Sequence, residues 1–218
     1  MGRALARSSA PMARHAVARP RPDVFPPSVS SWQLPTADRP VCGPASPAWV
    51  FLSAHGGAGA GLLARLSAAP SPATASGARR AGLPVTDFPS FAADVGGRWP
   101  NPQLEDVPPV VAVARTTMRG LACARAVATQ YLTEQAPTGV RLLGLVTVAD
   151  QPGRLPPPLA AAHSVLQGAY FRHWHVPYVP DYRLFAGLPG DRSPALHPDV
   201  DDVLTAIRFA ITPPEGQS

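Results

Sequence analysis

Hydrophobic positions divide the chain into a first part without a sustained pattern and a body in which strand-like and helix-like segments alternate. Three short apolar runs, at residues 49–54, 110–114 and 142–148, have no polar face. Strands covered by helices on both faces have this composition. A further short strand is predicted near residues 171–175.

Segments with helical periodicity separate these runs. We expect a helix to begin at Leu62, and a short one at about 159–166. A longer helix follows the second apolar run, with Thr116 or Thr117 as its N-cap. One face of it collects Leu121, Ala124, Ala128, Tyr131 and Leu132. Strands alternating with helices predict an α/β fold of three layers, a mostly parallel sheet flanked by helices.

The closing helix has the clearest pattern. Its apolar residues form one stripe of Val200, Val203, Leu204, Ile207 and Ile211. Asp202, Thr205 and Arg208 fall off the stripe, so we expect them to face solvent. Truncation of Ile207 is therefore expected to be costly, and truncation of Arg208 nearly neutral.

Prolines and small residues set the predicted boundaries of the domain. Residues 1–48 are rich in proline and arginine and poor in aromatic residues, which predicts a disordered tail. The α/β domain is expected at 49–212, followed by a disordered C-terminus at 213–218. Residues 70–106 have little pattern and are interpreted as a long surface connection.

Charge is concentrated in the tail. The 218 residues carry a net charge of +5, of which residues 1–48 supply +4, from six arginines against two aspartates. We therefore expect nucleic acid or an anionic surface to be contacted only through the arginine-rich tail. No apolar run approaches the roughly 18 residues of a membrane span, so a cytoplasmic location is expected. The first 22 residues also have the composition of a transit peptide, and Met12 is an alternative start.

A glycine-rich loop follows the first apolar run and leads directly into a helix. Such a loop points backbone N–H groups at an anion, because glycine permits positive φ and close approach. The candidate nucleotide- or anion-binding residues are Gly56, Gly57, Ala58, Gly59, Ala60, Gly61 and Leu62.

The body resembles a shortened bacterial branch of the ParA/MinD-like P-loop NTPases. Residues 53–63 are similar to the deviant Walker A loop, 142–150 to the late strand that ends near the purine base, and 174–178 to the loop that lines the base. The resemblance implies a base pocket made of Asp150, Pro177, Tyr178 and Asp181. It also implies possible dimerisation, and a role in plasmid or chromosome partitioning or in conjugative transfer.

Departures from that family's loop change the expected activity. His55 stands at the place of the signature lysine, Ala60 replaces the Walker lysine, and Gly61 with Leu62 replaces the hydroxyl pair that holds Mg²⁺. The sequence contains no lysine at all, and Arg65 and Arg115 do not occupy the loop position. Phosphoryl transfer depends on cations at the phosphates, so we expect no hydrolysis.

Two functions follow from this degenerate Walker A loop. One is a non-catalytic binding or scaffold protein that contacts a protein partner. The alternative is a residual nucleotide-binding protein that holds ATP or another nucleotide without turnover. No metal and no obligatory cofactor is expected in either case.

Three further motifs have an alternative interpretation. Residues 150–153, Asp-Gln-Pro-Gly, are typical of a turn but also of a Mg²⁺-linked switch loop. His55-Gly56-Gly57 also resembles an esterase oxyanion hole, although the sequence has no Gly-x-Ser-x-Gly nucleophile motif. His163, His173 and His175 fit either packed histidines or the beginning of a zinc site.

Overall fold

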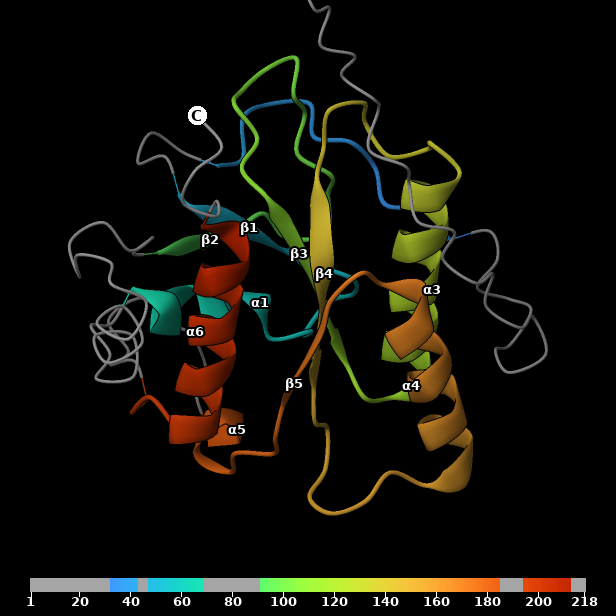
Figure 1. Ribbon diagram of the computed structural model, residues 1–218, viewed down its shortest axis with the longest axis vertical. Helices are drawn as coiled ribbons and strands as arrows, with labels where there is room; N and C mark the ends of the chain where they lie inside the picture. The colour runs from blue at the N-terminus through green and yellow to red at the C-terminus, as the bar shows by residue number, and fades with distance from the viewer. Residues whose placement is uncertain (1–31, 43–46, 69–90, 185–193, 213–218) are drawn as a thin grey trace, which may run out of the picture.

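Five parallel strands form the centre of the domain (Figure 1). The computed structural model describes residues 32–42, 47–68, 91–184 and 194–212. Across the sheet the strand order is β2-β1-β3-β4-β5, and every pairing is parallel. The strands are β1 (Trp49–Ser53), β2 (Ala92–Asp94), β3 (Val110–Arg115), β4 (Leu142–Val148) and β5 (His173–Val176). The α/β architecture expected from the sequence is confirmed.

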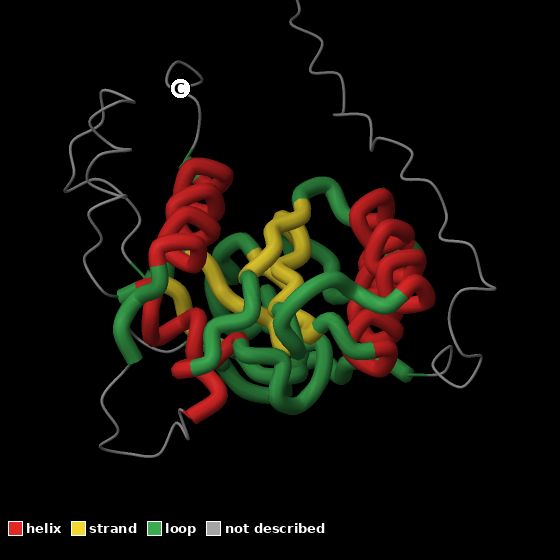
Figure 2. The backbone as a smooth tube through the Cα atoms, turned by 90° about the horizontal axis from the view of Figure 1, so that it is seen from below, coloured by secondary structure: helices red, strands yellow, loops and turns green. Residues whose placement is uncertain are grey.

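Helices cover both faces of the sheet, as Figure 2 shows from below. One face carries α1 (Ala60–Ser67) and α6 (Pro198–Ile211), and the other carries α3 (Met118–Leu132) and α4 (Pro157–Ala169). The short α5 (Asp181–Leu184) follows β5. None of the described helices has the length and apolar character needed to cross a membrane.

Strand β3 shows why the apolar runs lack a polar face. Val110, Ala112 and Ala114 pack in the core beneath α3 and α4, while Val111 and Val113 pack in the core beneath α1 and α6. All five are fully buried. Successive side chains of a strand point to opposite faces, so a strand between two helical layers is apolar at every position.

Two helices depart from their predicted stripes. Thr117 is the N-cap of α3, and its hydroxyl accepts the Gly120 N–H at 3.0 Å, but Leu132 at the end of that helix is 44% exposed. On α6 the prediction for Arg208 is wrong. Its side chain is buried, donates to the Ser67 carbonyl at 2.7 Å, and lies over the Trp49 ring. Truncating it therefore also removes packing and leaves a buried acceptor without its partner.

The predicted disordered tail at 1–48 is too long, because residues 32–42 pack on the domain. Leu34, Ala37 and Cys42 are buried there. Residues 1–31 and 213–218 lie outside the described residues, as do 69–90 of the predicted connection. The described end of that connection is also structured, since it contains β2 and the fully buried Trp99.

A pairing between these two irregular segments explains both errors. The Ala37 N–H donates to the Trp99 carbonyl at 2.8 Å, and the Trp99 N–H donates to the Pro35 carbonyl at 2.9 Å. The carboxylate of Glu105 accepts the N–H groups of Val41 and Cys42 at 3.0 and 2.9 Å. Neither segment has a regular period, because each is held by partners about sixty residues away in sequence.

Gln130 of α3 joins the two segments to the helix. Its side-chain oxygen accepts the Leu34 N–H and the Trp99 indole N–H, both at 3.2 Å. Gln130 is only 3% exposed, so no solvent replaces a lost acceptor. A single buried amide therefore satisfies two donors from different parts of the chain.

Gln130→Met should lower the free energy of unfolding by at least about 2 kcal/mol, because two buried donors lose their acceptor while the volume is kept. The matched control is Gln167→Met, because Gln167 is an exposed residue of another helix, α4. That change should stay within about 0.5 kcal/mol. Urea unfolding of both variants measures the difference, and equal small shifts would contradict the pairing of 32–42 with the domain.

Candidate functional site

The chain reverses its direction across the sheet between β1 and β3. From β1 it passes through α1 to β2 on one side, and then crosses to β3 on the other side. Open parallel sheets of this strand order bind ligands outside the carboxyl ends of the strands, at this switch point. The loops that follow β1 and β3 are therefore the first place to look for a site.

A histidine joins the two loops at the switch point. His55, just after β1, accepts the backbone N–H of Arg115 on Nε2 at 3.1 Å and donates from Nδ1 to the Gly56 carbonyl at 2.8 Å. Burial, together with the charges of Arg115 and Arg119, lowers the pKa of His55. The neutral ring is the form that these bonds require, because Nε2 must keep its lone pair.

The first turn of α3 packs tightly against this histidine. A Cβ added at Gly120 would lie 2.2 Å from the Arg115 carbonyl oxygen and 2.8 Å from His55 Nε2. No side chain fits there, so glycine is required for the close approach of helix, strand end and imidazole. The first turn of α3 therefore packs directly against His55 and the end of β3.

Two arginines and one aspartate lie close together at the carboxyl edge of the sheet. Arg115, at the end of β3, donates from Nε to the Gly57 carbonyl at 2.6 Å and has Nη1 3.8 Å from Asp150 Oδ1. Arg183 of α5 has Nη2 2.7 Å from the same oxygen and also donates to the Asp150 backbone carbonyl. Burial, and next the charge of Arg183, lowers the pKa of Arg115. Two cations thus share one carboxylate.

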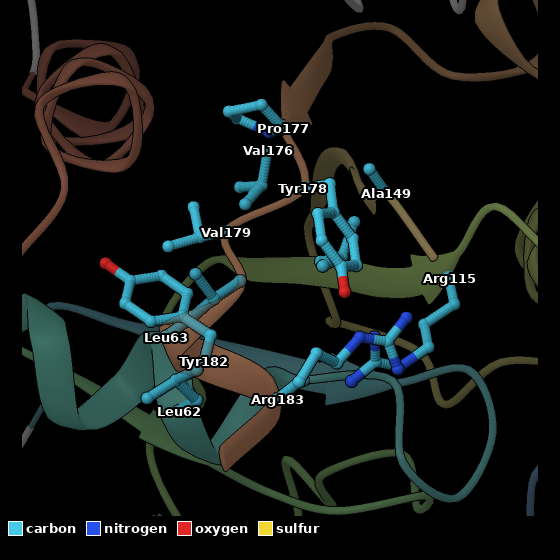
Figure 3. A pocket seen from close by; sticks show the side chains of 12 residues that line it. Leu62, Leu63, Arg115, Ala149, Val176, Pro177, Tyr178, Val179, Tyr182 and Arg183 are labelled. Atoms are coloured by element: carbon cyan, nitrogen blue, oxygen red, sulfur yellow. The ribbon is translucent and has the colours of Figure 1, made fainter. Parts of the chain in front are cut away.

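A pocket opens beside these arginines at the carboxyl edge of the sheet (Figure 3). Its cavity volume is about 30 Å³, and it is partly open to solvent. In Figure 3 the side chains of Arg115 and Arg183 extend toward each other at its rim. It is lined by Gly59, Leu62, Leu63, Arg115, Val148, Ala149, Val176, Pro177, Tyr178, Val179, Tyr182 and Arg183.

Only part of the predicted glycine loop lines this pocket. Gly59, which has φ of 102° and is the N-cap of α1, lines the pocket together with Leu62. Gly56 and Gly57 are exposed in the turn before it. Ala58 and Ala60 are buried in the core under α1 and α6. Gly61 faces away from the pocket toward β2.

Asp94, at the end of β2, lies next to Gly61 of α1. A Cβ added at Gly61 would lie 3.1 Å from Asp94 Oδ2, and Asp94 Oδ1 accepts the Gly96 N–H at 2.8 Å. Burial raises the pKa of Asp94, which bonds from Gly96 and Ser53 partly offset. A carboxylate here disfavours a second anion on this side of the loop. The accessible anion contacts are therefore those on the arginine side.

The four predicted base-pocket residues lie near one another. Pro177 and Tyr178 line the pocket, and Asp150 pairs with the arginines at its rim. Asp181 begins α5 and is exposed outside the lining. The Asp150 N–H donates to the Thr116 hydroxyl at 3.0 Å, and Gly153 has φ of 85°, as expected for a turn.

The sequence pattern does not single out the two arginines of the candidate site. Arg115 lies outside the position of the Walker lysine, and Arg183 belongs to no motif. A signal for Arg115 was present, since it ends a buried strand. Its significance depends on β3 lying next to β1, which the sequence does not state.

A second polar cluster lies between β4, β5 and α4. The buried hydroxyl of Thr147 lies 3.0 Å from His163 Nε2, from His173 Nε2 and from His175 Nδ1. A hydroxyl has one proton and two lone pairs, so at least two of these nitrogens must donate to it. The ring of His163 meets the rings of His173 and His175 edge to face.

Burial favours the neutral forms of the three imidazoles. Burial, and next the charges of its two neighbours, lowers the pKa of His173 to about 4. Burial also lowers the pKa of His163 and of His175. In the described part of the chain no group of three His, Cys, Asp or Glu side chains is arranged to hold a metal ion. The histidines surround a hydroxyl instead.

Comparisons with protein-family models, curated proteins and solved structures gave no match.

The close approach at Gly120 predicts opposite effects for two helical glycines. Gly120→Ala should destabilise the fold by about 1–3 kcal/mol, because the new methyl group meets the Arg115 carbonyl and His55. Gly168→Ala in α4 is the control, since nothing lies within 4 Å of its added Cβ, and it should stabilise by up to about 1 kcal/mol. Thermal and urea unfolding test both. A stabilising Gly120→Ala would show that the contact with His55 is loose.

The histidines predict a loss of stability in mild acid. Their pKa values are lower in the folded chain than the ordinary value of 6.5, so the unfolded chain binds protons first. Their contribution is complete above about pH 6.5 and is lost as the pH falls toward 4. The urea midpoint should fall over this range, and His173→Asn should make the fall shallower. An unchanged slope in that variant would contradict the prediction.

Proposed function

We propose that the domain binds a small ligand that carries an acidic group, at the pocket beside Arg115 and Arg183, and does not transfer phosphoryl groups. The observation that supports this most strongly is the convergence of two guanidinium groups on one carboxylate oxygen at the switch point of the sheet. Arginine presents several N–H donors in a planar fork that suits carboxylate and phosphate.

The charge balance at the pocket favours an anion. Arg115 and Arg183 carry two positive charges against the single charge of Asp150, so one positive charge is in excess. The N-cap of α1, Gly59, lines the pocket, so the positive end of the helix dipole lies on the same side. An acidic group is therefore stabilised from the strand ends and from the helix.

The rest of the lining is apolar. Val148, Val176 and Val179 stand beside the ring of Tyr178, and the Arg183 guanidinium lies 5.6 Å from the centre of that ring. An apolar or planar portion of the ligand fits against this wall. Because the cavity is small and partly open, the ligand is compact or extends into solvent.

The loop positions that correspond to a Walker A motif supply no group for phosphoryl transfer. Ala60 and Gly61 offer neither a cation nor a Mg²⁺ ligand, and Gly61 faces the carboxylate of Asp94. A nucleotide held without turnover belongs to the proposed ligand class. The scaffold role, the protein partner, dimerisation and the cytoplasmic location remain predictions.

Arg183→Gln should weaken binding of an acidic ligand at least about tenfold, since a charged hydrogen bond contributes about 1.5–3 kcal/mol. The probes are phenyl phosphate, benzoate, AMP and ATP, each titrated by thermal shift and by calorimetry. Arg141→Gln is the control, because Arg141 is exposed at the opposite edge of the sheet and its loss changes the net charge equally. Binding that is absent from the native chain, or is lost equally in both variants, would contradict the proposed function.

A further inference from the structure

We propose that the carboxylate of Asp150 occupies the anion position between Arg115 and Arg183 in the free chain, and that a ligand carboxylate or phosphate monoester displaces it on binding. This inference rests on the proposed function, because it describes how the same pocket is filled and emptied. Asp150 is then an internal competitor that sets the affinity of the site.

The contacts of Asp150 resemble those of a bound anion. Its Oδ1 lies 2.7 Å from Arg183 Nη2 and 3.8 Å from Arg115 Nη1, so one oxygen is shared by two cations from different elements. The side chain of Asp150 is 37% exposed, that of Arg183 is 34% exposed and that of Arg115 is 22% exposed. Exchange at this rim therefore needs no opening of the core.

The backbone of Asp150 is anchored independently of its carboxylate. Its N–H donates to the Thr116 hydroxyl, and its carbonyl accepts from Arg183 Nη2. The loop after β4 keeps both contacts when the side chain rotates away. Displacement is therefore a change of side-chain conformation, without unfolding of the loop.

The arginines are also held by contacts other than Asp150. The Nε of Arg115 donates to the Gly57 carbonyl, and the Arg183 guanidinium lies against the Tyr178 ring. These contacts keep both guanidinium groups at the rim after the carboxylate leaves. A ligand anion therefore meets donors that are already in place.

The direction in which Asp150→Asn changes ligand affinity distinguishes two roles of Asp150. The carboxylate either competes with the ligand or orients the two arginines. If Asp150 competes, Asp150→Asn removes the internal anion and its repulsion, and ligand affinity rises. If Asp150 instead orients the arginines, the same change loosens them and affinity falls. Asparagine keeps the shape and a carbonyl oxygen for Arg183, so the change tests charge with little change in volume.

The experiment titrates phenyl phosphate and inorganic phosphate at constant ionic strength and pH 7.5, with Kd read by calorimetry. We expect Asp150→Asn to bind phenyl phosphate about threefold to tenfold more tightly than the native chain. The control is Asp106→Asn, since Asp106 is exposed before β3, at the amino edge of the sheet, and its loss changes the net charge equally. Its Kd should equal that of the native chain. If Asp150→Asn does not fold, Asp150→Ser replaces it.

Each other outcome contradicts the inference in a distinct way. An unchanged or weaker Kd in Asp150→Asn, with binding in the native chain, overturns the competitor role and leaves the proposed function standing. An equal gain when Arg183→Gln is also present shows a general charge effect and likewise overturns it. If neither the native chain nor any variant binds a probe, the inference and the proposed function fail together.

Discussion

The hydrogen bond from the Arg115 N–H to His55 Nε2 joins β1 and β3 at the point where the chain changes direction. Several features depend on it. The neutral imidazole fixes the turn before α1, and the strand end that it holds carries the guanidinium at the pocket rim. Gly120 is required because α3 packs directly against the same ring. His55 thus has a structural role that positions the candidate site.

Most strands and helices that build the two faces of the sheet follow from patterns of neighbouring residues, so these elements were predictable from the sequence. The apolar runs at β1, β3 and β4, the Thr117 cap and the stripe of α6 are properties of neighbouring residues. Arg208 was mispredicted because its helical position at the edge of the stripe does not reveal the Ser67 carbonyl that it meets. Burial of an arginine depends on a partner that is distant in sequence.

Long-range pairing limits what the sequence reveals about the site. The three-residue β2, the pairing of Pro35 and Ala37 with Trp99, and the convergence of Thr147 with three histidines all join segments that have no common pattern. Gly59, Leu62, Pro177 and Tyr178 line one pocket, because the carboxyl ends of parallel strands meet at this edge, and their role in binding stays a prediction. The arginines were missed, because their meeting requires the strand order and the position of α5.

Amide chemical shifts recorded during a titration with phenyl phosphate test most directly whether an acidic ligand is held at the carboxyl edge across the switch point. The account predicts the largest changes at Gly57, Gly59, Asp150 and Arg183, with saturation at a common Kd. Residues at the amino edge, such as Arg141, should not shift. Changes centred on that edge, or none at saturating ligand, would contradict the account.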